Sequence, residues 1–510
     1  MFPSRAGLCI RTFLLALFLA LLLLLTYSQP FVRWHSQKEG SHAISNSHAG
    51  SDQQVHRLWR HDLAGHIDFW RQFQPLLTAY EPKCLPPLRL GMAPSIRFEQ
   101  ANHDDQAEYL DLLPMDVEDL TRSHDGFVNA IQSNPPQLNY TRNTRGLIST
   151  AGGSYLPVLV ISLRMLRRTG SQLPVEVFLA SEEEYESYIC DKVLPSLNAQ
   201  CIVLSAILSA IPHATQVQKY QFKLLAMLFS SFEEILFLDA DAFALSPPES
   251  LFTSEPFITH GMITWPDFWA STISPYYYEI TNQPIPDPPT RQSSESGEVL
   301  LSKKTHLRTL LLSTYYNIHG PDFYYPLLSQ GAAGEGDKET FVTAAMTLGE
   351  LHYQVSEPIC AIGHTTERGF AGSAMVQFDP IEDFRRYLHR DNTRKHQLGH
   401  GAFITSTAAS PPPRAFFVHA NYPKFDPATV FDEHEVNPTK GDDGRFTRAW
   451  TGPLDIIQGF GRDVEREFWE EIQWTACELE GKFRAWKGKT GICKRVKRYY
   501  KTLYEGRWWD

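Results

Sequence analysis

The sequence of 510 residues lacks several features that mark common classes of protein. It contains no Cys-x-x-Cys pair, which argues against a structural zinc site. It has no excess of basic residues, because the net charge is −11, and this argues against nucleic acid as the main partner. It also contains no internal repeat. Any recognition of phosphate groups must therefore be local, through a metal ion or a few basic side chains.

One apolar stretch, residues 6–27, is long enough to cross a lipid bilayer, which takes about 20 residues. The sequence lacks a small-x-small cleavage site after Leu25, and Arg11 lies near one end, where its charge can reach the lipid headgroups. We therefore expect an uncleaved signal-anchor helix at 6–27 rather than a cleaved signal peptide. Residues 1–5 would be a cytoplasmic tail, and the large remainder would lie in the lumen, as in a single-pass type II membrane protein.

Two features after the anchor fit the secretory pathway. Residues 28–63 are rich in Ser, His, Gln and Gly and predict a flexible stem. Asn139 begins the only Asn-x-Ser/Thr site whose middle residue is not proline, so we expect a glycan there. Six cysteines outside the anchor allow 15 pairings, and the sequence neither chooses among them nor excludes free thiols. These cysteines are Cys84, Cys190, Cys201, Cys360, Cys477 and Cys493.

The most informative stretch is a short apolar run followed by two aspartates. Residues 235–238 have the composition of a fully buried strand. Asp239 and Asp241 follow at once, and residues two apart on an extended backbone point to the same side. In open α/β sheets, ligands bind outside the carboxyl ends of the strands. Two hard oxygen ligands there suit Mg²⁺ or Mn²⁺ bridging to a phosphate, which is the Asp-x-Asp arrangement of nucleotide-sugar glycosyltransferases.

Strands and helices alternate along residues 145–260. We expect strands at 146–150, 175–179 and 201–204, and helices at 154–168 and 220–229. This alternation predicts an α/β protein with a mainly parallel, Rossmann-like sheet. Ser181 and Glu184 have the spacing of a capping box and predict a helix start. Gly152 and Gly153 fit the first strand-to-helix turn, where the backbone can approach a donor ligand closely.

Several longer motifs occur in one order between Arg145 and Asp426. They include Lys223-Leu224-Leu225-Ala226, Trp265-Pro266-Asp267-Phe268-Trp269, Glu295-Ser296-Gly297-Glu298, Gly334-Glu335-Gly336-Asp337-Lys338-Glu339 and Val418-His419-Ala420-Asn421. With these motifs the chain resembles the fungal Golgi α-mannosyltransferases that build and branch cell-wall mannan. It is most similar to the α-1,2 enzymes of that family, to which the α-1,3 enzymes are related.

The resemblance implies a GT-A-like fold with additions on the acceptor side, GDP-mannose as donor and Mn²⁺, or Mg²⁺, as cofactor. It implies transfer of mannose, with retention, to a mannoside or glycoprotein glycan in the Golgi membrane, and a Golgi mannosyltransferase complex as a potential partner. We expect a lumenal catalytic domain at 64–510. Within it, about 145–260 would form the nucleotide-sugar half, 261–440 the acceptor half and 441–510 a C-terminal helical region.

The motifs supply candidates for the metal and donor site. Asp239 and Asp241 would hold the cation against the two phosphates of the donor. His419, which ends an apolar strand, is the candidate third ligand, and an imidazole would favour Mn²⁺ over Mg²⁺. A structural histidine is the alternative. Lys223 could neutralise donor phosphate, although a lysine on a helix usually faces solvent.

Three acids lie just before an expected apolar helix that starts at Phe341. Glu335, Asp337 and Glu339 could bind donor mannose hydroxyls or lie beneath the anomeric carbon as catalytic groups, because the start of a helix is a natural ligand site. Acids that only complement the helix dipole are the alternative.

Acceptor candidates lie in two further motifs. Trp265, Asp267 and Trp269 suit a sugar platform, with aromatic faces for C–H surfaces and a carboxylate for hydroxyls. An aromatic core cluster is the alternative. Glu298 could also contact the acceptor.

The residues alone leave two other classes open. Phosphatases of the haloacid-dehalogenase type also place Asp-x-Asp after an apolar strand, with the first Asp as nucleophile. Their motif has Thr or Val at the position of Phe243, and it normally lies at the start of the fold, whereas here about 90 residues of α/β pattern precede it. The second class is a glycan-binding protein that has a transferase fold but no catalytic activity. The presence of the carboxylates of Asp239, Asp241 and Asp337 argues against this class.

Overall fold

The computed structural model describes residues 61–98, 107–211, 217–218, 220–286, 291–397 and 412–505. The expected tail, anchor and residues 28–60 of the stem lie outside these residues. Residues 59–510 form one unit. Within the described ranges, no helix is both long and apolar enough to cross a membrane.

The unit is built on a mixed sheet whose order, among the described residues, is β10-β8-β9-β6-β3-β4-β5. Its strands are β3 (Thr141–Thr150), β4 (Val175–Leu179), β5 (Ala199–Val203), β6 (Phe232–Leu238), β8 (Met262–Ala270), β9 (Gln292–Ser302) and β10 (Tyr353–Gln354). The pairs β6–β3, β3–β4, β4–β5 and β10–β8 are parallel, whereas β9 is antiparallel to both of its neighbours. The prediction of a mainly parallel α/β sheet is therefore confirmed.

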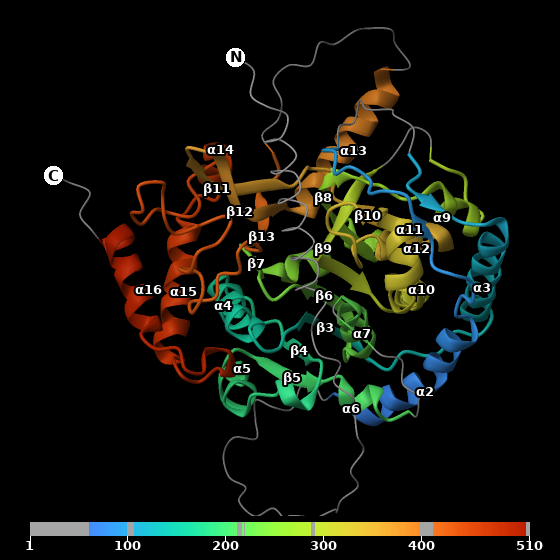
Figure 1. Cartoon of the computed structure of the whole chain (residues 1–510), viewed down its shortest axis with the longest axis horizontal. Coiled ribbons are helices and arrows are strands. Elements are labelled where there is room, and N and C mark those ends of the chain that lie inside the picture. The colour runs from blue at the N-terminus through green and yellow to red at the C-terminus, as the bar shows by residue number, and fades with distance from the viewer. Residues whose placement is uncertain are drawn as a thin grey trace, which may run out of the picture. The chain divides into compact units, whose positions relative to one another are not determined.

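A second, antiparallel sheet has the order β11-β12-β13-β7. Its strands are β7 (Ala242–Ala244), β11 (Cys360–Thr366), β12 (Gly369–Phe378) and β13 (Ala415–His419). Strand β7 begins directly after Asp241, and His419 of β13 pairs with Ala242. The small sheet thus brings the end of β13 to the two aspartates that follow β6, as Figure 1 shows near the centre of the unit.

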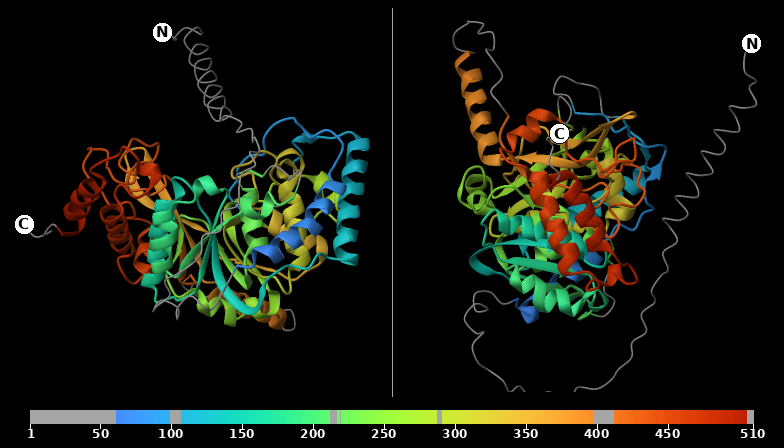
Figure 2. Two further views of the ribbon diagram at one scale, coloured as in Figure 1. Left: turned by 90° about the horizontal axis from the view of Figure 1, so that it is seen from below. Right: turned by 90° about the vertical axis from the view of Figure 1, so that its left-hand side faces the viewer.

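Alternating side chains of the large sheet enter two different cores. In β6, Leu236 and Leu238 face one cluster while Ile235 and Phe237 face the other, as the period of two on a strand requires. The first cluster includes α4 (Tyr155–Arg168), α15 (Val464–Glu478) and α16 (Ile492–Tyr500). The second includes α2 (Leu63–Ala79), α3 (Pro114–Ser133), α7 (Gln221–Phe229), α10 (Leu307–Ile318) and α12 (Thr340–Leu348). Figures 1 and 2 show α15 and α16 on the opposite side of the unit from α2 and α3.

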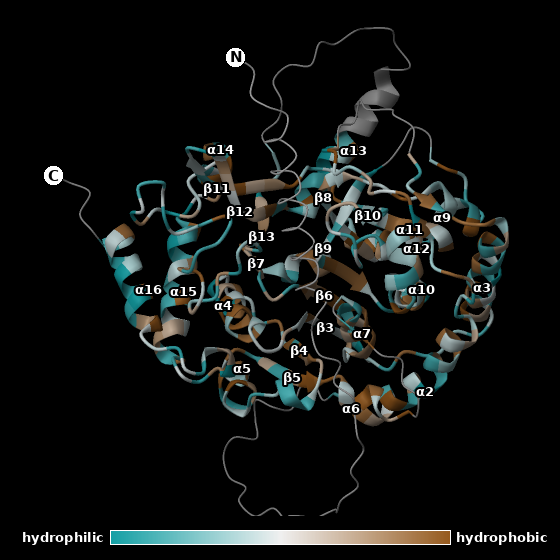
Figure 3. Cartoon of the chain, in the orientation of Figure 1, coloured by the Kyte–Doolittle hydropathy of each residue, from teal (hydrophilic) through white to brown (hydrophobic). Residues whose placement is uncertain are grey.

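The remaining labelled elements are short or peripheral. They are β1 (Leu88–Arg89), β2 (Leu110–Asp111), α5 (Leu194–Ser196), α6 (Ser205–Leu208), α8 (Phe257–His260), α9 (Pro275–Ile280), α11 (Tyr325–Ser329), α13 (Pro380–Gln397) and α14 (Leu454–Gly459). Figure 3 shows the basic helix α16 as largely hydrophilic along its visible side. Its apolar residues Ile492 and Val496 are buried against the first core, so the helix is amphipathic.

The predicted capping box at Ser181 is wrong. Ser181 precedes a short 3₁₀ turn, Glu182–Glu184, and its side chain makes no capping hydrogen bond. Glu184 instead accepts a hydrogen bond from the backbone N–H of Ala180 at 2.9 Å. The carboxylate reaches back to the end of β4 because the chain turns there before any α-helix is formed.

Two disulfides form among the described cysteines. One joins Cys190 to Cys201 in β5, and the other joins Cys477 of α15 to Cys493 of α16. Cys84 and Cys360 are free thiols. Two disulfides are typical of a protein that folds in an oxidising compartment.

Candidate active site

A cleft of about 670 Å³ opens at the carboxyl ends of β3, β4 and β6. Its lining is rich in charge: Glu184, Lys223, Asp239, Asp241, Asp267, Glu295, Asp337, Lys338 and Lys424 all contribute. Thr150, Ala151 and Gly152 form its floor at the end of β3. This is the place where open α/β sheets bind ligands.

Asp239, Asp241 and His419 form the candidate metal centre. One ligand atom from each residue lies within 4.8 Å of the others. The backbone holds the group together, because the Asp239 N–H donates to the carbonyl of Gly297 at 2.9 Å and the Ala420 N–H donates to that of Asp241 at 2.9 Å. Gly297 also leaves room for the imidazole, since a Cβ there would lie 2.7 Å from His419 Nδ1.

The charges around Asp241 are tightly coupled. His419 Nε2 lies 3.1 Å from Asp241 Oδ1, and the Lys424 ammonium pairs with the other carboxylate oxygen. Burial alone would lower the pKa of His419, but the Asp241 carboxylate raises it to about 10. Burial would likewise raise the pKa of Asp241, yet His419 and Lys424 hold it well below its usual range.

The residues present fit a divalent cation. The buried Nδ1 of His419 has no hydrogen-bond partner among the described residues, although it lies 3.8 Å from Glu295 Oε1. A ligating imidazole is neutral, so a bound cation would displace the proton that Asp241 holds on His419. Two carboxylates and one neutral imidazole are a donor set that suits Mn²⁺ and related first-row metals, and hard oxygen ligands alone also suit Mg²⁺.

Lys223 is a buried ion-pair partner rather than a solvated residue. Its side chain is 8% exposed, and Nζ lies 3.5 Å from Asp239 Oδ1 and 3.2 Å from Asp337 Oδ2. The ammonium also donates to the carbonyl and hydroxyl of Ser296 at 2.6 and 2.9 Å. Burial lowers the pKa of Lys223, but Asp239 and Asp337 outweigh burial and raise it. Lys223 therefore carries a positive charge at the bottom of the cleft.

Asp337 faces Asp239 across Lys223. It is buried, and burial raises the pKa of its carboxyl while Lys223 opposes that shift. The Ser296 hydroxyl donates to Asp337 Oδ1 at 3.3 Å. One lysine thus links the acid after β6 to the acid before α12 across the cleft.

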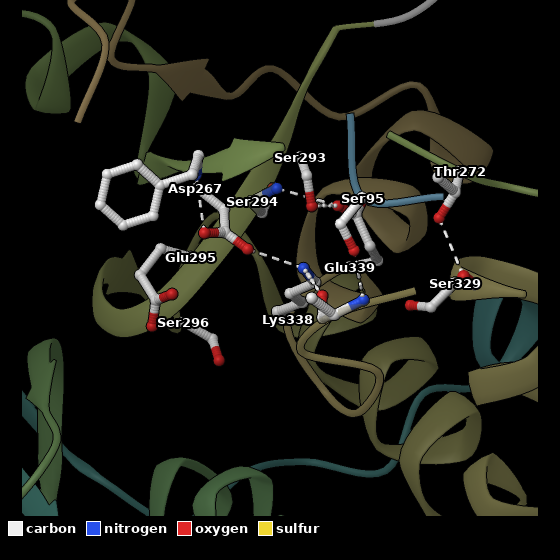
Figure 4. Close-up of polar contacts among 12 residues, drawn as sticks. Ser95, Asp267, Thr272, Ser293, Ser294, Glu295, Ser296, Ser329, Lys338 and Glu339 are labelled. Atoms are coloured by element: carbon white, nitrogen blue, oxygen red, sulfur yellow. Dashed lines mark hydrogen bonds and ion pairs between the residues drawn. The ribbon is translucent and has the colours of Figure 1, made fainter. Parts of the chain in front are cut away.

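The next residue, Lys338, fixes another acid in the lining. Its ammonium donates to Asp267 Oδ2 at 2.7 Å and to the carbonyl of Ala333 at 2.8 Å. Figure 4 shows Lys338 reaching toward Asp267 from the loop before α12. The structure therefore places Asp267 in the cleft, held in a buried ion pair.

The rest of the predicted sugar platform lies elsewhere. Trp265 is 0% exposed and packs edge-on against Phe417 between the two sheets, so it cannot present a face to a sugar. Its indole N–H donates to the carbonyl of Phe378 at 2.9 Å. Trp269 is half-buried outside the cleft lining. For Trp265, the aromatic-core alternative is the correct one.

Glu298 is also outside the cleft lining, because it lies fully buried within β9. Neither of its carboxylate oxygens has a hydrogen-bond partner among the described residues. Burial raises the pKa of Glu298 to about 8. A direct contact between Glu298 and the acceptor does not fit this position.

Two of the three predicted catalytic acids point away from the cleft. Glu335 forms a bidentate pair with Arg89 and accepts from the Gly331 N–H at 2.6 Å. Glu339 is buried behind the cleft wall, where it accepts from Ser293 Oγ at 2.7 Å and the Ser294 N–H at 2.8 Å, as Figure 4 shows. Through these contacts Glu335 and Glu339 stabilise the loop before α12. Of the three predicted acids, only Asp337 lines the cleft.

The two predicted glycines differ. Gly152 lines the cleft, whereas Gly153 lies outside the lining and adopts a left-handed φ of +52° that begins the turn into α4. The predicted glycosylation site, Asn139, donates from Nδ2 to the backbone carbonyl and the carboxylate of Asp62 at 3.3 and 3.2 Å. Glycosylation of Asn139 stays a prediction.

Sequence reasoning missed several residues that line the cleft. They are Tyr155, Glu184, Tyr220, Glu295, Lys338 and Lys424. Glu295 and Lys338 lie inside motifs that carried the resemblance, so their position in those motifs was an available signal. Lys424 and Tyr155 lie in no motif of that kind. The fold brings them together, because Lys424 pairs with Asp241 and its Nζ lies 5.8 Å from the centre of the Tyr155 ring.

The fold and the cleft define an α/β protein with a charged ligand site at the carboxyl ends of its parallel strands. The family model Mannosyl_trans3, described as a mannosyltransferase, matches residues 144–291 and 286–379. Alpha-1,2-mannosyltransferase MNN21 of Candida albicans is 33% identical over 475 residues, which cover 80% of this chain and 70% of that protein. Alpha-1,2-mannosyltransferase MNN2 of Saccharomyces cerevisiae is 32% identical over 432 residues, which cover 74% of this chain and 71% of that protein.

The chain therefore belongs to this mannosyltransferase family. It spans only 60% of the length of another relative, alpha-1,2-mannosyltransferase MNN24 of Candida albicans, to which it is 32% identical over 433 residues. The solved structure of the glycosyltransferase GlyE from Streptococcus pneumoniae TIGR4 is 12% identical and covers 69% of this chain and 64% of that chain, with a TM-score of 0.33. Likeness at that level does not define the fold, which is defined here by the strand order itself.

Proposed function

We propose that this protein transfers mannose from GDP-mannose to a mannoside acceptor, with an α-1,2 linkage, in the elaboration of mannan or glycoprotein glycans. The names of the relatives support mannosyl transfer and the α-1,2 linkage. One observation carries the assignment to this cleft: the group of Asp239, Asp241 and His419 faces Asp337 across the charged side chain of Lys223. We interpret the sheet, with its single antiparallel strand β9 among the described strands, as a GT-A-like fold.

The donor diphosphate would lie over the end of β6. Asp239, Asp241 and His419 would hold a divalent cation, most favourably Mn²⁺, which when bound supplies positive charge that stabilises the departing diphosphate. Lys223 and Lys424 add two fixed cations to the same part of the cleft. Because the chain as a whole is acidic, these local charges provide the attraction for a phosphorylated donor.

The donor mannose would lie between the diphosphate and Asp337. In that position the Asp337 carboxylate faces the anomeric carbon, and Lys223 opposes the rise in its pKa that burial causes. Asp267, held by Lys338, is an acceptor of hydrogen bonds from sugar hydroxyls. An α-linked product from GDP-α-mannose requires retention at the anomeric carbon, and Asp337 is the carboxylate of the cleft best placed to serve it.

The setting that we propose is the Golgi lumen, with the chain anchored by residues 6–27 and other Golgi mannosyltransferases as potential complex partners. The disulfides Cys190–Cys201 and Cys477–Cys493 and the Asn-x-Thr sequence at Asn139 support a secretory compartment. Immunofluorescence with a Golgi marker, together with a shift in gel mobility on removal of N-glycans, tests this setting.

A matched pair of variants tests the assignment of the site. Asp337→Asn is expected to lower the rate of mannose transfer from GDP-mannose to α-mannobiose by at least about 100-fold while it retains GDP binding. Glu335→Gln, two residues away but paired with Arg89 outside the cleft, is expected to transfer at close to the wild-type rate. NMR of the product distinguishes an α-1,2 from an α-1,3 linkage. Full activity of Asp337→Asn would contradict the assignment.

A further inference from the structure

The end of the cleft over β4 carries a carboxylate that the proposed chemistry of phosphate and mannose does not use. Glu184 lines the cleft beside Phe178 and Ala180. Its Oε2 accepts one hydrogen bond, from the Ala180 N–H at 2.9 Å. Among the described residues, Oε1 has no hydrogen-bond partner. A carboxylate offers about four acceptor positions, so most of those of Glu184 are available to a ligand.

The floor of the cleft is shaped to accommodate this carboxylate. A Cβ built on Gly152 would lie 2.2 Å from Glu184 Oε2 and 2.7 Å from Oε1, so both oxygens rest directly over the glycine. The three heavy atoms nearest to that Cβ would all belong to the Glu184 carboxylate. Only glycine at this position allows the carboxylate to lie flat on the turn after β3.

Glu184 lies where it would contact the nucleoside of the donor rather than its sugar. In the sheet, β4 lies two strands from β6, or about 10 Å from the strand that presents Asp239. Asp337 and Asp267 lie on the opposite wall, before α12 and in β8. If the diphosphate lies over the end of β6, the sugar extends toward Asp337 and the nucleoside toward β4.

We propose that Glu184 recognises the nucleobase of the donor by hydrogen bonds and selects guanine. This inference rests on the proposed function and deepens it. Guanine presents the N1–H and the exocyclic N2–H side by side on one edge, and a carboxylate can accept from both at once. Uracil presents a single N–H between two carbonyl oxygens, and these oxygens would repel the oxygens of the carboxylate. Adenine presents an acceptor nitrogen beside its amino group and is disfavoured for the same reason.

The ribose is the competing ligand for the same side chain, because an acid after the second strand of a nucleotide-binding sheet often accepts from ribose hydroxyls. The two contacts differ in what they discriminate. A ribose contact affects every ribonucleotide equally, whereas a base contact distinguishes guanine from hypoxanthine, which lacks the 2-amino group. Comparison of GDP, inosine diphosphate and UDP therefore separates them.

The test is calorimetric titration of the full-length protein with these three nucleotides in the presence of Mn²⁺. The wild type is expected to bind GDP about 10-fold more tightly than inosine diphosphate. Glu184→Gln is expected to weaken GDP binding about 10- to 100-fold and to remove that preference, with little change for UDP. The glutamine retains an amide oxygen for the Ala180 N–H, so the turn is expected to keep its fold.

Two further variants sharpen the result. Gly152→Ala must displace the Glu184 carboxylate and is expected to weaken GDP binding in the same selective way. Glu183→Gln changes an exposed neighbour outside the cleft lining and is expected to leave all three affinities unchanged.

Unchanged GDP binding in Glu184→Gln would overturn the inference, and so would an equal loss for all three nucleotides, which would assign Glu184 to the ribose. A wild type that binds UDP but not GDP would instead overturn the proposed donor. The two failures are therefore distinguishable.

Discussion

Replacement of Lys223 by methionine tests how strongly the cleft depends on one buried cation. Lys223 pairs with Asp337 at 3.2 Å and with Asp239 at 3.5 Å, and methionine keeps the apolar stem but removes the charge. Two carboxylates and the carbonyl of Ser296 would then lose their shared donor. The variant is therefore expected to be markedly less stable than the wild type in metal-free buffer.

The structure sets the magnitude. At an effective dielectric constant of about 20, each pair contributes about 5 kcal/mol of attraction before the cost of desolvation. Asp239 is 29% exposed, so solvent screens that pair, and most of the effect comes from Asp337, which is 5% exposed. Removal of one partner from a buried pair costs about 3–5 kcal/mol. We expect Lys223→Met to lose an amount in that range.

The assay is urea unfolding followed by tryptophan fluorescence, in EDTA and in Mn²⁺. The double variant Lys223→Met/Asp337→Asn should recover part of the loss, because it removes the carboxylate left unpaired. Lys304→Met, which changes an exposed lysine, should change the free energy of unfolding by less than about 0.5 kcal/mol. Mn²⁺ should stabilise Lys223→Met more than the wild type. A Lys223→Met protein as stable as the wild type in EDTA would refute the assignment of a buried, charge-paired lysine.

Three further predictions follow from other parts of the structure. The folded pKa of Glu298, about 8, lies above its ordinary value of 4.5, so its contribution to stability is complete below about pH 4.5 and is lost as the pH rises through about 8. Unfolding of Glu298→Gln measured between pH 5 and 9 should therefore show a smaller decline than the wild type; identical pH profiles would contradict this burial. Cys493→Ser, which opens the link between α15 and α16 with its sequence separation of 16, should cost about 3 kcal/mol in the same unfolding assay, and no loss would argue against the disulfide. Trp265→Ala should cost about 3–5 kcal/mol of stability, whereas the sugar-platform alternative predicts mainly a higher KM for the acceptor.

The central part of the fold was predictable because its signals are local. The apolar run before Asp239 indicates a buried strand by composition alone, and the alternation of strands with helices indicates a mainly parallel sheet. These two predictions need only the chain near each residue. His419 was predicted as the third metal ligand because it ends a strand in one of the motifs that carry the family resemblance.

The rest of the site depends on contacts between distant segments. Strand β7 has only three residues and pairs with β13, which lies far along the chain, so the pairing of these two strands left no signal that sequence reasoning could use. That sheet buries Trp265 and brings Lys424 to Asp241. The direction of Glu335 likewise follows from Arg89, a residue far upstream. Composition identified these residue types, but only the packing decides which of them face the cleft.

The most direct test of the proposed function is mannose transfer by the full-length protein. The assay combines GDP-mannose and α-mannobiose with Mn²⁺ or with EDTA and identifies the product linkage by NMR. We predict transfer with Mn²⁺, formation of an α-1,2-linked product with retention, and loss of transfer in EDTA. The absence of both mannose transfer and GDP binding in the presence of Mn²⁺ would contradict the assignment of this cleft to GDP-mannose.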